Sequence, residues 1–332
     1  MTDRPLWRRL RRLALAAACL CAAAGTARAT TWDAYTYLSS DQQAGVRGLA
    51  SLFAQLRQET AGALAITLHQ GGSLPINATS ITSTVADNVI QFGTDGFFSG
   101  NVPIAGLLRL PMLLRNSDEY ARAAAIAAPY VAQAYDRKGI VVLGQFVYPL
   151  QTIWSRRRLT RLADIRGQKL RVTSVEMGEF VRRFGGIPLT MGTADVAAAL
   201  DRGVVDAVLT ASSGAGMIWK DLLKYNYRFP VQYANAIMIA NRGAFTALPP
   251  ATQTLLRRDV DAEDAWITGT MQAEEATLTT QLQAGGLVVT AADPADIAAA
   301  GQLLAPYWDA WAKARGPAAV AALGKIRAAL DR

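Results

Sequence analysis

The sequence predicts an α/β protein with two lobes, each built on a mixed, mostly parallel sheet flanked by helices. Two kinds of segment follow one another along the chain. In one kind apolar residues alternate with polar ones, as in strands, and in the other they recur every three or four positions, as in helices. The chain has 332 residues and is 51% hydrophobic, which is enough for two domains. A proline and three consecutive arginines interrupt these patterns at residues 148–158, which we interpret as a crossing between the lobes.

The first part of the chain contains strands and helices in alternation. A helix is expected at residues 42–57 because Val46, Leu49, Phe53 and Leu56 fall on one face. Strands are expected at residues 30–38, 63–69, 89–92 and 139–144, and further helices at 80–88 and 117–137. The order strand, helix, strand favours parallel pairing through right-handed crossovers.

The second part is organised around a short strand that turns into a helix at residues 169–184. Leu170 and Val172 alternate with polar residues, and the apolar residues that follow have helical spacing. Further strands are expected at 187–191, 203–209, 231–240 and 287–290, and helices at 193–200, 248–282 and 294–330. We predict that residues 30–150 and 231–268 form lobe 1, that residues 151–230 and 269–332 form lobe 2, and that crossing strands and a long helix join them.

Residues 1–29 are predicted to be a signal peptide that directs the chain to the periplasm. Five arginines precede an apolar run at residues 13–24, and Ala27-Arg28-Ala29 is a typical cleavage pattern. Both cysteines, Cys19 and Cys21, lie in this leader, so neither a disulfide nor a thiolate metal site is expected in the mature chain. Two alternatives stay open here: a lipoprotein anchored at Cys19, and export by the twin-arginine route.

The formal net charge of +8 is largely a property of the leader. Its removal takes away six arginines and one aspartate, which leaves 28 basic and 25 acidic residues and a net charge of +3. A nucleic-acid partner is therefore not expected. No stretch after residue 29 approaches the roughly 20 apolar residues of a membrane span. We therefore do not expect the mature protein to be embedded in a membrane.

The sequence gives little support for catalysis. The only histidine, His69, lies within a predicted strand, and the G-x-S-x-G pattern of a hydrolase nucleophile is absent. Residues 212–216 are rich in Ser and Gly but lack the Gly-Lys-Ser/Thr ending of a phosphate-binding loop. Metal-ligand spacing is also absent. We expect a binding protein without a metal or cofactor rather than an enzyme.

Arg171 is the residue expected to contact the ligand. It lies at the exit of a strand that turns into a helix, and ligands of open α/β sheets bind outside the carboxyl ends of strands. A guanidinium there suits a carboxylate, although an arginine in this position can also pair internally with an aspartate. Polar groups from other strand ends are expected beside it, and aromatic residues, which can also pack in the core, would form walls. The polar residues are Gln151, Thr210, Ser212, Ser213 and Asn235, and the aromatic residues are Tyr37, Phe97, Phe98, Trp154 and Trp219.

Residues 164–172, Asp-Ile-Arg-Gly-Gln-Lys-Leu-Arg-Val, resemble the D-x-K-G-x-K-x-R-x segment of the periplasmic substrate-binding proteins of TRAP transporters, the DctP-type family. The resemblance extends to Gly-Gly-Ile-Pro at 185–188, to Gly-Val-Val-Asp at 203–206 and to an N-x-x-x-F-x-x-L-P-P pattern at 241–250. It implies a hinged, two-lobed periplasmic binding protein fold, type II-like, that closes on a small carboxylate ligand. The same resemblance implies delivery of this organic acid to a TRAP membrane permease driven by an ion gradient, with Arg171 as the carboxylate-binding arginine.

Two departures from the sialic-acid-binding members of that family narrow the expected ligand. Gln151 stands where those members carry a second arginine, and Leu209-Thr210-Ala211 replaces their Glu-Asn-Pro. A lone arginine beside Gln151 favours one carboxylate over two. Residues 148–151 and 209–219 resemble a subgroup with Pro-x-Gln and Thr-Ser-x-x-x-Gly segments, which implies a monocarboxylate such as a 2-oxo, 2-hydroxy or aromatic acid. Two alternatives stay open: a binding protein for an ABC permease or a sensor kinase, and a secreted hydrolase, which the single histidine disfavours.

Overall fold

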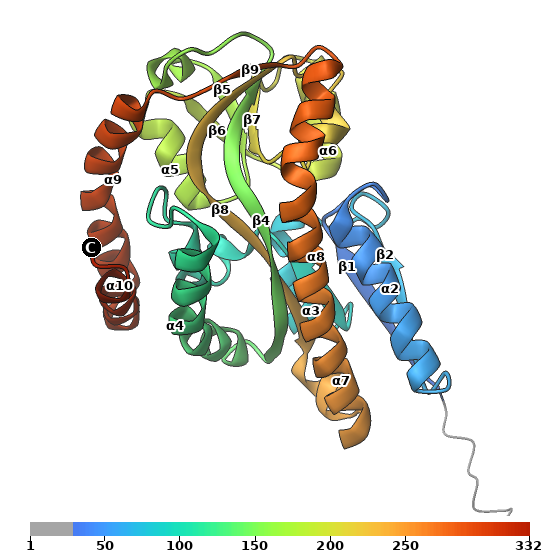
Figure 1. Cartoon of the computed structure of the whole chain (residues 1–332). Coiled ribbons are helices and arrows are strands. Elements are labelled where there is room, and N and C mark those ends of the chain that lie inside the picture. The colour runs from blue at the N-terminus through green and yellow to red at the C-terminus, as the bar shows by residue number, and fades with distance from the viewer. Residues whose placement is uncertain (1–28) are drawn as a thin grey trace, which may run out of the picture.

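The computed structural model describes residues 29–332 (Figure 1). The predicted signal peptide, apart from its last residue, and both cysteines lie outside the described residues. One mixed sheet of nine strands runs through the molecule in the order β2-β1-β3-β8-β4-β7-β5-β6, with β9 paired to β8. Helices flank this sheet, so the predicted α/β class is confirmed (Figure 1).

Strands β1, β2 and β3 form one end of the sheet. β1 pairs in parallel with both β2 and β3, as the order of strands and helices predicted. Strand β3 begins three residues later than expected because Asn88, with a φ of 56°, ends the preceding helix and leaves Val89 exposed. The elements are β1 (Thr30–Thr36), α2 (Ala44–Glu59), β2 (Leu64–His69), α3 (Ile81–Ala86), β3 (Phe92–Asp95) and α4 (Ser117–Asp136), with short 3₁₀ helices η1 (Ala78–Ser80), η2 (Phe98–Gly100) and η3 (Pro103–Arg109).

Two long antiparallel strands, β4 (Ile140–Ser155) and β8 (Tyr225–Asn241), cross the molecule and join its two halves (Figure 1). Residues 148–151 were expected to break the regular structure, but they lie within β4. That expectation is wrong because the register shifts between Tyr148 and Gln151, and this irregularity accommodates Pro149, which has no N–H to donate. The chain therefore passes between the halves as continuous strand.

Strands β5, β6 and β7 form the other end of the sheet. β5 pairs in parallel with β6 and β7, and β7 pairs antiparallel with β4. β5 and the helix after it lie where they were expected, whereas β7 begins four residues late because Gly203, with a φ of 65°, closes a turn first. The elements are η4 (Leu162–Ile165), β5 (Lys169–Val172), α5 (Val175–Arg183), β6 (Ile187–Thr190), α6 (Thr193–Asp201), β7 (Ala207–Thr210) and η5 (Gly216–Trp219).

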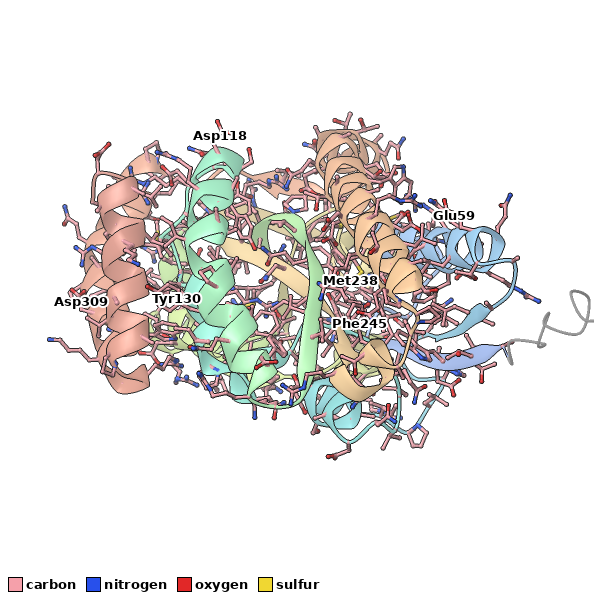
Figure 2. All side chains as sticks on the ribbon, turned by 90° about the horizontal axis from the view of Figure 1, so that it is seen from below. Glu59, Asp118, Tyr130, Met238, Phe245 and Asp309 are labelled. Carbon is pink, nitrogen blue, oxygen red and sulfur yellow. The ribbon has the colours of Figure 1, made fainter. Side chains whose placement is uncertain are left out.

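The long helix α8 (Pro250–Ala284) matches the one expected at 248–282 and runs beside β4 and α2 (Figure 1). It follows the short α7 (Arg242–Thr246) and precedes β9 (Val288–Thr290), α9 (Pro294–Arg315) and α10 (Pro317–Ala329). α10 packs against α4, at the side of the molecule opposite α2 (Figure 2). The exact lobe boundaries stay a prediction. Among the described residues, no helix combines the length and apolar character that a bilayer span requires.

A buried carboxylate lies where α8 packs on β4. Asp264 accepts a hydrogen bond from the backbone N–H of Gln145 at 2.5 Å, and its Oδ1 is buried without a hydrogen-bond partner in the described residues. Gly144 leaves space for this carboxylate, because a Cβ at position 144 would lie 2.1 Å from its Oδ2. Burial raises the pKa of Asp264 to about 8, and the nearby carboxylates of Asp261 and Glu263 add to the rise.

Candidate functional site

A cavity lined by residues of both halves lies at the level where β5 and β7 end. Its volume is about 40 Å³, measured as the space open to the centre of a water molecule. Since one water needs roughly 10–15 Å³ of such space, the cavity has room for a small molecule and not for a polymer. Five of the predicted site residues line it: Tyr37, Gln151, Arg171, Thr210 and Asn235. The sequence thus located residues that the fold brings together, although Gln151 and Asn235 lie inside β4 and β8 and not at strand ends.

Arg171 lies on β5 with 3% of its surface exposed. Its Nε donates to the backbone oxygen of Met191 at 3.1 Å, and no ion pair or other hydrogen bond holds the guanidinium within residues 29–332. The internal pairing with an aspartate, left open by the sequence, is therefore absent from the described part of the chain. The guanidinium carbon lies 5.4 Å from the ring of Trp219 and 5.8 Å from that of Phe97. Its two terminal nitrogens are available to a ligand.

Burial lowers the pKa of Arg171 to about 10, so the guanidinium keeps its charge at neutral pH. A buried charge without a partner costs free energy, because the low-dielectric surroundings replace water. Such a group is compensated when a ligand brings the opposite charge. The arrangement is suited to binding a carboxylate through two parallel N–H···O bonds.

A second guanidinium, that of Arg109 at the end of η3, lines the same cavity. Its Nε donates to Oδ1 of Asn235 at 3.0 Å, and its terminal nitrogens donate to the backbone oxygens of Gly96 and Asn235. The guanidinium carbon lies 4.1 Å from the ring centre of Phe98, and burial lowers the pKa of Arg109. The expectation of a lone arginine is therefore wrong. Each nitrogen of Arg109 donates to a protein oxygen, whereas only the Nε of Arg171 does so.

A pair of tyrosine hydroxyls forms another part of the lining. The hydroxyls of Tyr37 and Tyr148 lie 2.6 Å apart. Burial raises the pKa of Tyr37 to about 12 and raises that of Tyr148 well above its usual value, so both stay protonated. One hydroxyl hydrogen joins the pair and the other is left for an acceptor. The ring of Tyr37 packs directly on Gly96, where an added Cβ would lie 2.4 Å from it.

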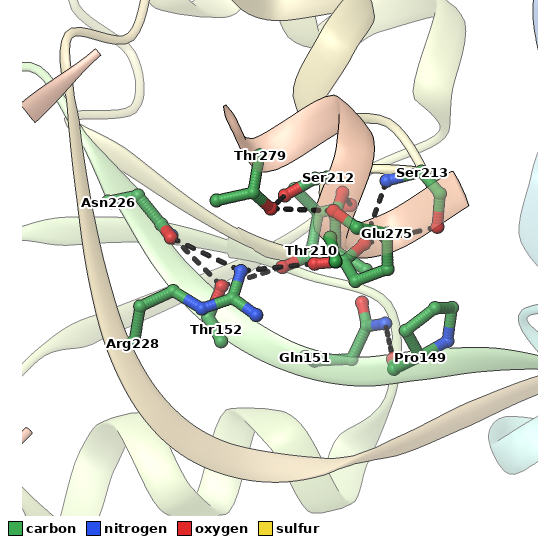
Figure 3. A network of polar contacts seen from close by, with 12 residues as sticks. Pro149, Gln151, Thr152, Thr210, Ser212, Ser213, Asn226, Arg228, Glu275 and Thr279 are labelled. Atoms are coloured by element: carbon green, nitrogen blue, oxygen red, sulfur yellow. Dashed lines mark hydrogen bonds and ion pairs between the residues drawn. The ribbon is translucent and has the colours of Figure 1, made fainter. Parts of the chain in front are cut away.

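Gln151 and Thr210 contribute the uncharged polar groups that the sequence predicted. The side-chain amide of Gln151 donates to the backbone oxygen of Pro149 at 2.7 Å, which directs its Nε2 away from solvent and leaves its Oε1 as an acceptor (Figure 3). Thr210 ends β7, and its backbone oxygen accepts hydrogen bonds from Thr152 and Trp154. Thr173 and other threonines of the second half complete this side of the lining.

Four predicted site residues do not line the cavity. Trp154 is fully buried in the core of the second half, where its Nε1 donates to the oxygen of Thr210 at 3.2 Å. Ser212 and Ser213 turn toward α8, because their hydroxyls bond to Thr279 at 2.6 Å and to Glu275 at 3.1 Å (Figure 3). The ring of Phe98 packs face-on against the guanidinium of Arg109. These residues shape the cavity indirectly.

The loop after β7 is fixed from two sides. Glu275 of α8 accepts from the backbone N–H of Ser213 at 2.9 Å and forms an ion pair with Arg228 at 3.0 Å (Figure 3). On the other side, the amide of Gln43, at the start of α2, donates to the backbone oxygen of Gly214 at 3.1 Å. Gln43 and Gly214 both line the cavity. The contact between them joins the two halves at the cavity wall.

The comparison with protein families decides the identity. The DctP family of bacterial extracellular solute-binding proteins, family 7, matches residues 37–314, a range that contains every lining residue of the cavity. The chain belongs to this family. The prediction drawn from residues 164–172 is therefore confirmed.

Solved structures share the fold of this solute-binding protein. A Bordetella pertussis extracytoplasmic solute receptor binding pyroglutamic acid has 24% identity and a TM-score of 0.83, covering 90% of this chain and 99% of its own. A TRAP periplasmic solute-binding protein from Roseobacter denitrificans, with bound β-D-glucuronate, has 22% identity and a TM-score of 0.80 over the same shares. One from Shewanella oneidensis, with bound succinate, has 16% identity and a TM-score of 0.80, covering 89% and 99%. The predicted two-lobed fold is confirmed.

Sequence reasoning missed five polar residues of the cavity in this solute-binding protein: Gln43, Arg109, Tyr148, Thr173 and Thr193. Arg109 lies in a Gly- and Pro-punctuated segment with no strand to point to it, and a fully buried arginine is rare enough to be discounted from sequence. Tyr148 was obscured by the supposed break at Pro149. Within residues 29–332, no group of three or more His, Cys, Asp or Glu is arranged to hold a metal ion.

Proposed function

We propose that this chain is the periplasmic receptor of a TRAP transporter and captures a small organic acid through a pair between Arg171 and the ligand carboxylate. The observation that carries the proposal is the buried guanidinium of Arg171, whose terminal nitrogens meet no protein acceptor in the described residues. The small cavity around it is consistent with a ligand of few atoms. Family membership supports a role in solute capture rather than catalysis.

The ligand carries one carboxylate and an uncharged polar group. Among the described residues that line the cavity, Arg171 offers two terminal nitrogens without a protein acceptor, whereas each nitrogen of Arg109 already donates once, to Gly96 or Asn235. The hydroxyl pair of Tyr37 and Tyr148 can donate to a neutral oxygen such as a carbonyl or hydroxyl. Pyroglutamic acid and β-D-glucuronate, bound by two structural relatives, each combine one carboxylate with neutral polar groups. Succinate, bound by a third, has two carboxylates, so the fold alone does not decide.

The acid is delivered to the membrane subunits of a TRAP permease. The family match and the TRAP proteins among the structural relatives favour this partner over an ABC permease or a sensor kinase. A functional test is acid uptake by vesicles that contain a TRAP permease from the same organism, with and without the receptor. Uptake that does not depend on the receptor would contradict the assignment. Export to the periplasm is checked by fractionating cells that express the full chain.

A thermal-shift screen tests the ligand class. A ligand that binds only the folded state stabilises it by RT ln(1 + [L]/Kd), about 2.7 kcal/mol at a hundredfold excess over Kd. The panel contains pyroglutamate, lactate, pyruvate, phenylpyruvate, glucuronate and succinate. We expect a monocarboxylate to give the largest shift, with one ligand bound per chain in calorimetry and no turnover. A larger shift with succinate would overturn the monocarboxylate assignment, and no shift with any acid would overturn the organic-acid assignment.

A further inference from the structure

The arginine segment, defined as residues 156–166, concentrates positive charge. It contains five arginines and one aspartate, a net charge of +4, whereas the whole of residues 30–332 carries a net charge of +3. The remainder of the chain after the leader is therefore slightly acidic. The segment follows the end of β4 and lies at the end of the second half, away from β1, β2 and α2 (Figure 1).

The segment is held in place by apolar anchors. Leu159, Leu162 and Ile165 recur every three residues and are buried, with at most 5% of their surface exposed. All five arginines, in contrast, are exposed. The 3₁₀ helix η4 within the segment is closed by Asp164, which accepts backbone hydrogen bonds from Thr160 at 2.9 Å and Arg161 at 3.1 Å. The charges are thus displayed on an ordered piece of backbone and not on a flexible tail.

Little in the structure neutralises these arginines. Asp164 pairs with Arg161 at 3.2 Å and is occupied mainly by the backbone N–H groups. Arg156 and Arg157 donate to backbone oxygens, which carry no net charge. The side chains of Arg158 and Arg166 have no ion pair or hydrogen bond to another residue within the described part of the chain. The carboxylate of Asp296, on α9, also lies beside the segment and accepts from the backbone N–H of Leu162 at 3.4 Å. With five arginines against two carboxylates, the segment still presents positive charge to solvent.

The composition of the segment points to phosphate groups as the partner. Every basic residue in it is an arginine, whose planar fork binds phosphate oxygens in pairs. Protein interfaces are usually built around buried aromatic or apolar residues, whereas the large apolar residues of this segment all point into the core. We propose that the arginine segment docks this receptor on a membrane surface by binding the headgroup phosphates of anionic phospholipids. Such docking would confine the search for a membrane partner to the bilayer surface.

Vesicle binding tests the proposal. The chain without residues 1–29 is centrifuged with vesicles of phosphatidylcholine alone or mixed with phosphatidylglycerol, at low and high salt. We expect binding only to the anionic vesicles and its loss in 1 M salt, where the Debye length falls to about 3 Å. Each arginine near an anionic surface strengthens binding about fivefold. The double variant Arg158→Gln with Arg166→Gln, which removes no ion pair and no side-chain hydrogen bond among the described residues, should therefore weaken partitioning by at least tenfold, on the order of the product of the two effects.

A matched control separates local charge from overall charge. Arg57 and Arg137 are exposed, lie in the first half and have no side-chain partner among residues 29–332. The double variant Arg57→Gln with Arg137→Gln loses the same two charges and should keep nearly full vesicle binding. Equal losses in the two double variants would overturn the proposal, as would equal binding to neutral and anionic vesicles. Binding that requires permease in neutral vesicles would also overturn it, because the partner would then be the protein.

Discussion

Replacing Arg171 by methionine should abolish acid binding without destabilising the ligand-free protein. The two effects separate because this arginine serves the ligand and hardly serves the fold. Within residues 29–332 it makes one hydrogen bond, to the backbone oxygen of Met191, and no ion pair. Methionine matches the length of the buried apolar stem and removes only the charged head. A residue whose role is structural would show the opposite pattern, with lost stability and retained affinity.

The magnitudes follow from the burial of the guanidinium. Two charge-assisted hydrogen bonds to a carboxylate contribute about 1.5–3 kcal/mol each, so losing both should weaken binding at least 100-fold, since each 1.4 kcal/mol is about tenfold. In the ligand-free protein, burial lowers the pKa of Arg171 from 12.5 to about 10. That shift means that burying the charge lowers the free energy of unfolding by about 3 kcal/mol. Removing the charge should offset the lost hydrogen bond and leave the melting temperature unchanged or higher.

Calorimetry with the best acid from the thermal-shift panel measures the affinity, and thermal unfolding without ligand measures the stability. Arg171→Lys keeps the charge but not the fork and should bind with intermediate affinity. Arg202→Met, at an exposed arginine that follows α6, is the control and should change neither quantity. If Arg171→Met binds the acid nearly as tightly as the unchanged chain, the assignment of the site is wrong. If it unfolds at a much lower temperature, Arg171 is structural.

Three further changes test the surroundings of the cavity. Gly96→Ala should displace the tyrosine ring that packs on it, cost about 1–3 kcal/mol of stability and weaken acid binding, whereas Gly100→Ala, with open space around its Cβ, should be nearly neutral in both assays. Asp264 has a pKa of about 8 in the folded protein, above its unfolded value of 3.8, so it binds protons more tightly when folded. The free energy of unfolding should therefore fall as the pH rises from about 4 to 8. Asp264→Asn should flatten this dependence in thermal melts, and an unchanged slope would refute the role of Asp264 in it. Glu275→Gln should loosen the loop after β7 and weaken acid binding several-fold, whereas Glu274→Gln, in an exposed ion pair, should not; equal effects in calorimetry would contradict the role of Glu275.

The sequence predicted the regular parts of the fold because their signals are local. The alternation around Leu170 and Val172, and the helical spacing after them, placed β5 and α5 correctly. The same reasoning failed at residues 148–151, because a proline usually ends a strand and the register shift that tolerates Pro149 depends on the partner strand β8. A local pattern cannot report a distortion that two distant segments share.

The candidate site was predictable in part, and strand ends were one of the signals. Arg171 and Thr210 were found because a strand exit marks each of them, whereas Gln151 was found in the predicted crossing between the lobes and lies within β4. Ser212 and Ser213 follow the same strand as Thr210 but turn to Thr279 and Glu275 of α8, whose position the loop sequence does not encode. In these cases sequence gave the right region, and the side-chain direction depended on a helix more than 60 residues away.

The two arginines of the cavity have different roles in ligand binding, and this difference affects how many carboxylates the ligand can carry. If both guanidiniums were free, the cavity would suit a dicarboxylate. Three of the five N–H groups of Arg109 already donate to Gly96 and Asn235, which leaves two for a second carboxylate, whereas Arg171 donates once to the protein and keeps four. A neutral oxygen needs only the free hydroxyl hydrogen of the tyrosine pair. The charge of Arg109 still attracts an anion through the low-dielectric interior. Affinity for negative charge thus comes from both arginines, whereas the orientation of the carboxylate comes from Arg171 alone.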